Sequence, residues 1–195
     1  MQTNTKRLDG MRVAILVATD FEQVELTEPR KALEAAGAKT TIISPKAGQI
    51  NGVNHDVKAD TFNVDLTLDQ ANPNDFDAVL LPGGALNADF LRMEDKARKF
   101  VRQVNQSGRP IAAICHAPWL LVSAGVVKGR TLTSFFTIQD DIRNGGGHWV
   151  DQEFVRDHNL VTSRSPEDLN AFNPGIIELF AEYKEKGPIQ VPVTA

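Results

Sequence analysis

The sequence predicts a single α/β domain built on a doubly wound, mostly parallel sheet. Three observations lead to this fold class. Continuous apolar runs of strand length recur along the chain, amphipathic segments lie between them, and glycine ends most of those segments. Strands that helices cover on both faces have such continuous apolar runs, and each strand–helix–strand unit closes with a right-handed connection. The 195 residues, 42% of them hydrophobic, are enough for one full core.

The elements follow in order along the chain. The run RVAILVA predicts the first buried strand, and TEPRKALEAAG predicts a helix that Thr27 caps and Gly37 ends. The later pairs repeat this pattern, and the segments 129–135, 138–147 and 149–165 continue it. The predicted buried strands are 12–18, 39–44, 77–81 and 110–115, and the predicted helices are 27–37, 93–108, 116–125 and 174–187.

One segment departs from the alternation. Residues 48–68 are short-period and polar, which predicts a small hairpin with Asn51 and Gly52 at its turn. We therefore expect an N-terminal tail over residues 1–11, one domain over 12–186 and a C-terminal tail over 187–195.

Charge and cysteine content narrow the function classes. The net charge of -4 and the pI of about 5.6 argue against nucleic-acid or polybasic membrane partners. One cysteine allows no internal disulfide, and no secretory or membrane-length apolar run is visible, so we expect a cytoplasmic protein. Nucleotide-binding glycine motifs and HExxH or CxxC motifs are also missing, so we expect neither a cofactor nor a metal.

Cys115, the only cysteine, lies in PIAAICHAP, where a predicted strand ends and a helix begins. This is the geometry of a nucleophile elbow, which exposes a side chain at the edge of the sheet. Unpaired helix N–H groups would point at the sulfur, which predicts a thiol pKa well below the usual value of about 8.5. The alternative is a small buried hydrophobe that closes a strand. Gly83-Gly84 and Glu22, at two other strand ends, favour the elbow.

Five segments carry a family resemblance. From about Arg12 to Phe180 the chain resembles the intracellular protease I (PfpI) family, in the superfamily of the Parkinson-disease deglycase. That superfamily is similar in fold to class I glutamine amidotransferases, which implies a flavodoxin-like α/β sandwich. The segments are FEQVELTEP, LPGGALNADFLR, AAICHAPWLLVSAGVVKGR, IQDDIRNGGGHWVD and LVTSRSPEDLNAF.

The resemblance implies a role for each matching residue. Cys115 is the expected nucleophile and His116 the expected catalytic histidine. Glu22 matches the glutamate whose carboxyl lies against the thiol. Asp89 matches an acid that orients the histidine and that, in family oligomers, comes from the adjacent subunit. The backbone amides of Gly84 and His116 would form the oxyanion hole, and a homo-oligomer, dimer or hexamer, is expected.

Each role has a simpler structural alternative. The alternative for His116 is a solvent-facing residue in a first helical turn. For Glu22 it is an exposed acid in a first helical turn, and for Asp89 it is a solvated acid on a loop. One position departs from the family: Phe135 stands where some members have tyrosine and the deglycase branch has histidine. This leaves His116 as the only good candidate for a base.

The leading functional hypothesis is an enzyme with covalent cysteine catalysis. The resemblance implies glyoxalase activity on small aldehydes, removal of early glyoxal adducts from proteins, and peptide hydrolysis. The small neighbours of Cys115 favour aldehydes over peptides. The rival hypothesis is a redox-sensing stress protein or chaperone that uses an oxidisable Cys115. A glutaminase subunit is disfavoured because no His-x-Glu pair follows in the PEDL stretch.

Overall fold

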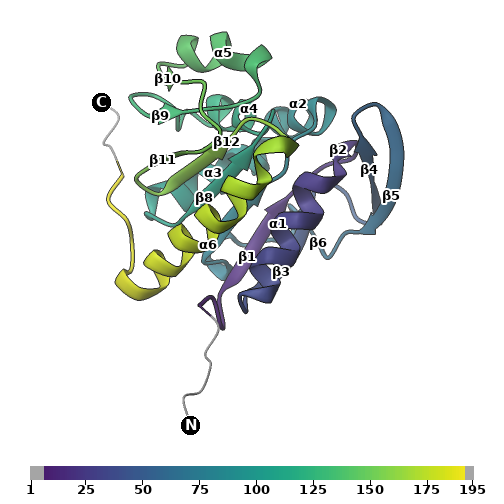
Figure 1. Cartoon of the computed structure of the whole chain (residues 1–195). Helices are drawn as coiled ribbons and strands as arrows, with labels where there is room; N and C mark the ends of the chain where they lie inside the picture. Colours follow the sequence, from purple (N-terminus) through teal and green to yellow (C-terminus); the bar gives the residue numbers. More distant parts are fainter. Residues whose placement is uncertain (1–6, 192–195) are drawn as a thin grey trace.

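A seven-stranded sheet forms the centre of the computed structural model, which describes residues 7–191 (Figure 1). Its strands are β1 (Arg12–Leu16), β3 (Lys39–Ser44), β6 (Leu66–Thr67), β7 (Ala78–Leu81), β8 (Ile111–Ile114), β11 (Val155–Asp157) and β12 (Leu160–Ser163). They lie in the order β11-β12-β8-β7-β1-β3-β6, and every pairing is parallel except that of β11 with β12. The predicted α/β class with a mostly parallel sheet is confirmed.

Six α-helices lie within residues 7–191, and five of them cover the sheet. The six are α1 (Gln23–Ala35), α2 (Ala85–Met93), α3 (Asp95–Gln106), α4 (Pro118–Ser123), α5 (Gln139–Asn144) and α6 (Leu169–Lys186). Helices α1 and α6 pack together on one face of the sheet, and α2, α3 and α4 lie on the other (Figure 1).

The core has two halves, one on each face of the sheet. Successive side chains of a strand point to opposite faces. Val13 and Ile15 accordingly pack with α1 and α6, whereas Ala14 and Leu16 pack with the helices of the other face. Both halves are fully apolar along the central strands, which explains why the sequence shows continuous runs and not alternation.

The predicted hairpin exists, but its turn lies elsewhere. Strands β4 (Gln49–Asn54) and β5 (Val57–Asn63) pair antiparallel, and the turn falls at residues 55–56, where His55 has a positive φ of 59°. Gly52 lies inside β4, at a shift in register. A Cβ atom there would come within 2.7 Å of Gln23 Oε1, so glycine serves close packing against α1 and not a turn.

Three helices differ from the sequence expectation. Helix α1 begins at Gln23 and α6 at Leu169, each several residues before its predicted start, with Pro29 and Pro174 inside them. Residues 85–93, expected as loop, form α2. The prolines suggest helix starts close to them, but both helices begin earlier. Burial of an apolar helix face, such as that of Leu26 and Leu33 in α1, stabilises the additional N-terminal turns.

The packing continues past the predicted domain boundaries at residues 12 and 186. Leu8 and Met11 are buried, and Leu8 N donates to Ala36 O at 2.8 Å. At the other end Ile189 N donates to Gly108 O at 2.9 Å. The predicted tails also include residues 1–6 and 192–195, which lie outside the described residues.

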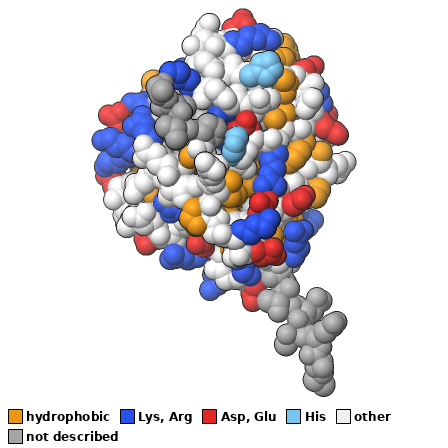
Figure 2. All heavy atoms as spheres, turned by 90° about the vertical axis from the view of Figure 1, so that its left-hand side faces the viewer, with side chains coloured by type: hydrophobic (Ala, Val, Ile, Leu, Met, Phe, Trp, Pro, Cys, Tyr) orange, Lys and Arg blue, Asp and Glu red, His pale blue; other side chains and the backbone are white. Residues whose placement is uncertain are grey.

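The surface carries charges of both signs. Figure 2 shows Lys and Arg side chains interspersed with Asp and Glu side chains on the face it presents. Among residues 7–191, no helix is long and apolar enough to span a membrane.

Candidate active site

Three strand ends meet at one edge of the sheet. Strands β8, β7 and β1 are consecutive neighbours, so the residues that follow them lie side by side. They are Cys115 after β8, the Pro82–Gly84 turn after β7, and β2 (Phe21–Glu22), which leads from β1 into α1. Carboxyl ends of parallel strands are the usual place for ligand binding in such folds.

Cys115 adopts the strained backbone of an elbow. Its φ is +63°, a left-handed conformation that non-glycine residues rarely adopt. Two backbone hydrogen bonds hold it there: its N–H donates to Ser163 O at 3.1 Å, and its carbonyl accepts from Phe135 N at 2.8 Å. The side chain is 6% exposed. The backbone is thus fixed in a conformation that turns the thiol toward the neighbouring strand ends.

The glycine turn beside the thiol has no space for side chains. A Cβ atom on Gly83 would lie 2.5 Å from Cys115 Cβ and 2.4 Å from Glu25 Oε2. The buried Asn87 side chain holds this turn in place: Nδ2 donates to the carbonyls of Pro82 and Gly83 at 2.9 Å each, and Oδ1 accepts from Ala18 N at 2.6 Å. The turn therefore brings its own backbone against the sulfur.

Glu25, not Glu22, has its carboxyl against the thiol. Glu25 lies in the first turn of α1, is fully buried, interacts with the Cys115 side chain, and accepts a hydrogen bond from Gly83 N at 2.9 Å. Burial, reinforced by the charge of Glu22, raises the pKa of Glu25 to about 8. Glu25 is therefore protonated at neutral pH.

Glu22 has a different task. It is 8% exposed and its Oε2 accepts from His55 N at 3.0 Å, which ties the turn of the β4–β5 hairpin to the start of α1. The expected pairing of Glu22 with the thiol is therefore corrected. The segment FEQVE contains two glutamates three residues apart, and α1 begins between them. Glu22 is the residue just before the helix, whereas Glu25 lies in the first helical turn and points toward the thiol.

The predicted low pKa of the thiol is also corrected. Burial and the negative charge of an ionised Glu25 raise the pKa of Cys115, whereas hydrogen bonds from the backbone N–H groups of Gly84 and His116 lower it. The local sequence shows the helix donors but not the burial of the thiol. A thiol with a raised pKa keeps its proton at neutral pH, so attack by its sulfur would need a base nearby.

His116 is the candidate for that base. Its Nδ1 lies 3.1 Å from Cys115 Sγ, and burial lowers the pKa of the imidazole, which keeps it neutral at pH 7. Adjacent residues on a helix or strand face apart, but the left-handed backbone at Cys115 lets the two side chains meet. The structure thus brings Cys115, His116, Gly84 and Glu25 together.

Asp89 is not part of this cluster within one chain. It lies on α2 and not on a loop, it is exposed, and its side chain makes no hydrogen bond or ion pair with any residue between 7 and 191. The far nitrogen of His116 instead meets Thr137 within the same chain, with Oγ1 3.2 Å from Nε2. The sequence analysis missed Thr137 because a single hydroxyl two residues after Phe135 carries no motif.

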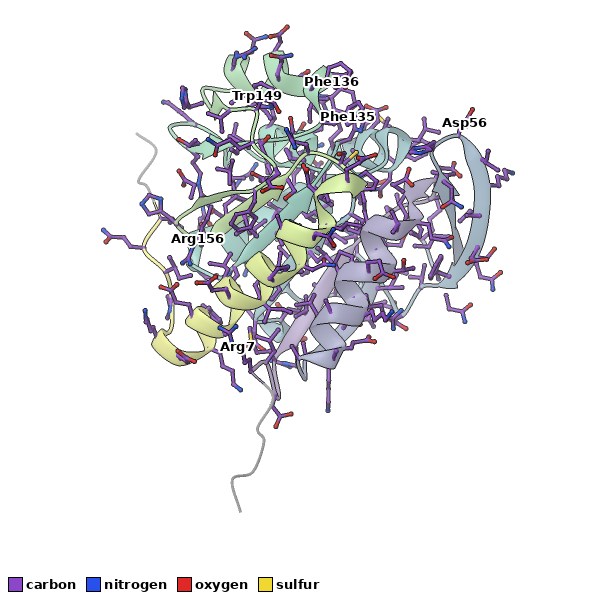
Figure 3. All side chains as sticks on the ribbon, in the orientation of Figure 1. Arg7, Asp56, Phe135, Phe136, Trp149 and Arg156 are labelled. Atoms are coloured by element: carbon purple, nitrogen blue, oxygen red, sulfur yellow. The ribbon has the colours of Figure 1, made fainter. Side chains whose placement is uncertain are left out.

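Two aromatic rings pack around His116. His116 stacks on Phe135, with ring centroids 4.6 Å apart and planes at 27°, and the Trp119 ring lies 6.0 Å away. Figure 3 shows Phe135 beside the exposed Phe136 at the end of the molecule where α5 lies.

Beyond Gly84 a cavity of about 370 Å³ separates α2 from the hairpin turn. It is lined by Asp20, Val53, His55, Asp56, Lys58, Gly84, Ala85 and Leu86.

Known proteins share this arrangement of elements. The model of the DJ-1/PfpI family matches residues 11–179. This chain belongs to that family. Two curated relatives are a deglycase of Thermococcus kodakarensis, 41% identical over 87% of this chain and 99% of its own length, and the deglycase PfpI of Pyrococcus furiosus, 42% identical over 87% and 99%.

Solved structures agree with the family membership. The crystal structure of Drosophila melanogaster DJ-1beta superposes with a TM-score of 0.79 at 30% sequence identity, over 90% of this chain and 92% of that one. Across residues 7–191 no cluster of three or more His, Cys, Asp or Glu side chains could hold a metal ion.

Proposed function

We propose that this protein is a stress-related, cysteine-dependent enzyme that acts on reactive carbonyl compounds, as a glyoxalase or protein deglycase. Peptides are the second substrate class. The observation that carries the proposal is the surroundings of one sulfur atom: Cys115 Sγ faces His116 Nδ1 at 3.1 Å, the N–H groups of Gly84 and His116, and the carboxyl of Glu25. The deglycase relatives support the same reaction class.

The first step forms a carbon–sulfur bond. His116 Nδ1 takes the thiol proton while the sulfur adds to the aldehyde carbon of methylglyoxal. The electron pair of the C=O bond moves to oxygen, and the N–H groups of Gly84 and His116 are the donors proposed to stabilise the resulting oxyanion. The oxyanion then takes the proton from His116, which gives the hemithioacetal. An early adduct on a protein amine reaches the same hemithioacetal when its carbon–nitrogen bond breaks and the proton goes to the departing amine.

The second step needs no external oxidant. A base moves the proton from the former aldehyde carbon to the neighbouring carbon, and the hydroxyl proton passes to the ketone oxygen. The first carbon is thereby oxidised to a thioester while the ketone is reduced to an alcohol. Water then hydrolyses the thioester to lactate and returns the thiol. The net reaction adds one water to methylglyoxal, which requires no cofactor. His116, whose Nδ1 lies 3.1 Å from the sulfur, is the proposed base for both proton transfers.

The walls of the site favour small aldehydes over peptides. The thiol is 6% exposed, and His116, Phe135 and Trp119 close one side of it. An aldehyde needs room for a few atoms, whereas an extended peptide needs a groove that reaches the sulfur. The cytoplasm is the proposed place of action, because an unpaired catalytic thiol is maintained in a reducing compartment.

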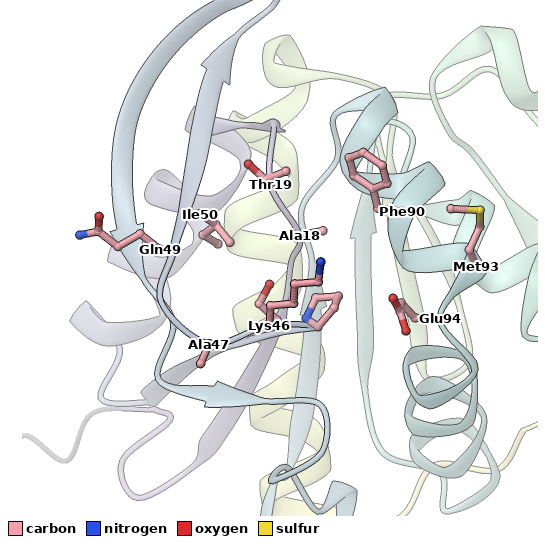
Figure 4. A pocket seen from close by; sticks show the side chains of 11 residues that line it. Ala18, Thr19, Lys46, Ala47, Gln49, Ile50, Phe90, Met93 and Glu94 are labelled. Carbon is pink, nitrogen blue, oxygen red and sulfur yellow. The ribbon is translucent and has the colours of Figure 1, made fainter.

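Assembly into a homo-oligomer is part of the proposal. Leu86, Phe90 and Met93 are exposed by 56%, 39% and 65%, and with Asp89 they share one face of α2. Phe90 and Met93 also border an apolar cavity of about 410 Å³ at the ends of β1 and β3 (Figure 4). A carboxylate inside an exposed apolar stripe fits a face that a second copy covers, with Asp89 reaching the partner's site.

A steady-state assay tests the proposed function. Wild type and Cys115→Ser are compared on methylglyoxal, a glycated peptide and casein, with lactate, free amine and cleaved peptide as readouts. We expect lactate and free amine from the wild type alone, with slower or no release of peptide. Equal lactate formation by both proteins would overturn the proposal.

A redox-sensing role is the second candidate, and one observation favours it. Cys115 is the only cysteine, and the donors around its sulfur would also bind the oxygens of a sulfinic acid. Turnover before and after mild peroxide treatment separates the two functions. A sensor or chaperone without enzymatic activity would show no turnover in either state and would gain its activity on oxidation.

A further inference from the structure

The far nitrogen of His116 already has a partner in its own chain. An acid from a second subunit is the expected orienting group, yet Thr137 Oγ1 lies 3.2 Å from Nε2 while Nδ1 lies 3.1 Å from the thiol sulfur. Both ring nitrogens are thus within hydrogen-bonding distance of groups on the same protomer. Within one protomer the imidazole therefore already has a partner at each ring nitrogen.

We propose that Thr137 is a positioning residue that holds His116 with Nδ1 facing the thiol as acceptor. The inference rests on the proposed function of His116 as the base for Cys115. In this arrangement Nε2–H donates to Thr137 Oγ1, which leaves the lone pair of Nδ1 free to take the thiol proton. When His116 becomes charged, the same hydrogen bond is retained and strengthens.

The segment that carries Thr137 is tied to the elbow itself. Phe135 N donates to the carbonyl of Cys115 at 2.8 Å, and Ile138 is buried on the other side of Thr137. Thr137 therefore moves with the backbone of Cys115 and keeps its distance from the imidazole. The Phe135 ring, stacked on His116, fixes the plane in which the two hydrogen bonds lie.

A hydroxyl also differs chemically from the acid expected at this position. A carboxylate would stabilise the imidazolium strongly and make the neutral base harder to regain, whereas a neutral hydroxyl orients the ring with a smaller effect on its charge. This suits an imidazole whose pKa burial already lowers. Thr137 and a partner's Asp89 are therefore not equivalent, and the two are tested separately.

The test compares Thr137→Val with Thr137→Ser. Valine has the shape of threonine without the hydroxyl, and serine keeps the hydroxyl without the methyl group. Because Thr137 is exposed, neither change removes core packing. We expect Thr137→Val to lower kcat on methylglyoxal by about 3- to 10-fold, the usual value of one neutral hydrogen bond, with KM unchanged. Thr137→Ser should stay within about twofold of the wild type.

A second readout does not depend on turnover. The chain has four histidines, so the His116 ring resonances are assigned by their loss in His116→Asn and then titrated by NMR. Without the acceptor at Nε2, the pKa of His116 should fall in Thr137→Val and return in Thr137→Ser. An unchanged titration in the valine variant overturns the inference.

The two readouts keep the inference separate from the proposed function. If the wild type does not turn over methylglyoxal, the NMR titration still decides whether Thr137 holds the ring. If Thr137→Val is fully active and Asp89→Asn is not, the orienting group is the acid and Thr137 has no positioning role. A loss in both Thr137→Val and Thr137→Ser would mark a structural effect and equally overturn the inference.

Discussion

At the scale of residues, three short-range contacts determine what Cys115 can do. The sulfur is close to a neutral imidazole, to two backbone donors and to a carboxyl that keeps its proton at neutral pH. In the proposed mechanism, the imidazole removes the proton, the donors receive developing negative charge, and the neutral carboxyl adds no repulsion. Each of these effects depends on burial, which sequence alone shows poorly.

Removal of the base is the first test at this scale. His116→Ala should lower kcat on methylglyoxal by about 10² to 10⁴, the usual contribution of a general base. The Phe135 ring, which stacks on His116, has no group that could accept the proton in its place. His148→Ala, a change at an exposed histidine outside the site, is the control. Near-normal turnover in His116→Ala would show that another group acts as the base.

The buried carboxyl makes a prediction about stability and pH. The pKa of Glu25 is about 8 in the folded protein and about 4.5 in the unfolded chain, so between these values the folded state binds more protons. The contribution of Glu25 to the free energy of unfolding should therefore fall as pH rises from 4.5 to 8, by about 1.4 kcal/mol for each unit of pKa shift. Urea titrations from pH 5 to 8.5 measure this.

Glu25→Gln is the matched variant for that measurement. Glutamine keeps the shape but cannot ionise, so the wild type should lose stability relative to Glu25→Gln as pH rises. Glu28→Gln, at an exposed position on the same helix, should follow the wild-type curve. Parallel curves for wild type and Glu25→Gln would mean that Glu25 does not hold its proton.

At the scale of elements, the Pro82–Gly84 turn packs directly against the elbow at Cys115. Gly83 touches both Cys115 and Glu25, so any side chain there must displace them. Gly83→Ala should abolish most activity and destabilise the protein by about 2 kcal/mol or more, the range for overpacking in a core. Gly125→Ala is the control: φ there is +71° with open space around it, so a cost of about 1 kcal/mol and full activity are expected. Equal loss of activity in both would contradict this account.

The elements also show how far sequence reasoning reaches. Strands β1, β3, β7 and β8 were predictable because burial on both faces leaves continuous apolar runs. The elbow was predictable because a polar, reactive residue ends such a run. The start of α1 was not, since Gln23 and Val24 carry no cap signal. Glu22 was assigned from the family resemblance, whereas Glu25, in the first turn of α1, is the residue that lies against the thiol.

Other site features were invisible for a different reason. Thr137 reaches His116 because η2 (Phe136–Ile138) folds back over the elbow, a tertiary arrangement that no local pattern encodes. Helix α2 was missed because its apolar face is exposed and its residues 85–93 do not look like a core-facing helix. Both cases depend on contacts between segments distant in the chain.

At the scale of the whole molecule, the exposed face of α2 predicts shared active sites. If Asp89 acts in the partner's site, a mixture of inactive Cys115→Ser and inactive Asp89→Asn subunits should regain part of the turnover, because some mixed sites contain both intact groups. Subunit exchange is verified with a tag on one partner. Verified exchange without regained activity would remove Asp89 from the partner's site.

Met93→Glu, which puts charge in the apolar stripe, should dissociate the oligomer in sedimentation experiments.

The central claim is that Cys115 bonds covalently to the carbonyl substrate. The most direct measurement mixes the protein with methylglyoxal, quenches it in acid within milliseconds to seconds, and maps the modified residue by mass spectrometry. The account predicts an adduct of one substrate on Cys115 that forms and decays within a turnover and is absent from Cys115→Ser. Turnover without any adduct on Cys115, or an equal adduct on lysine or arginine in both proteins, would contradict it.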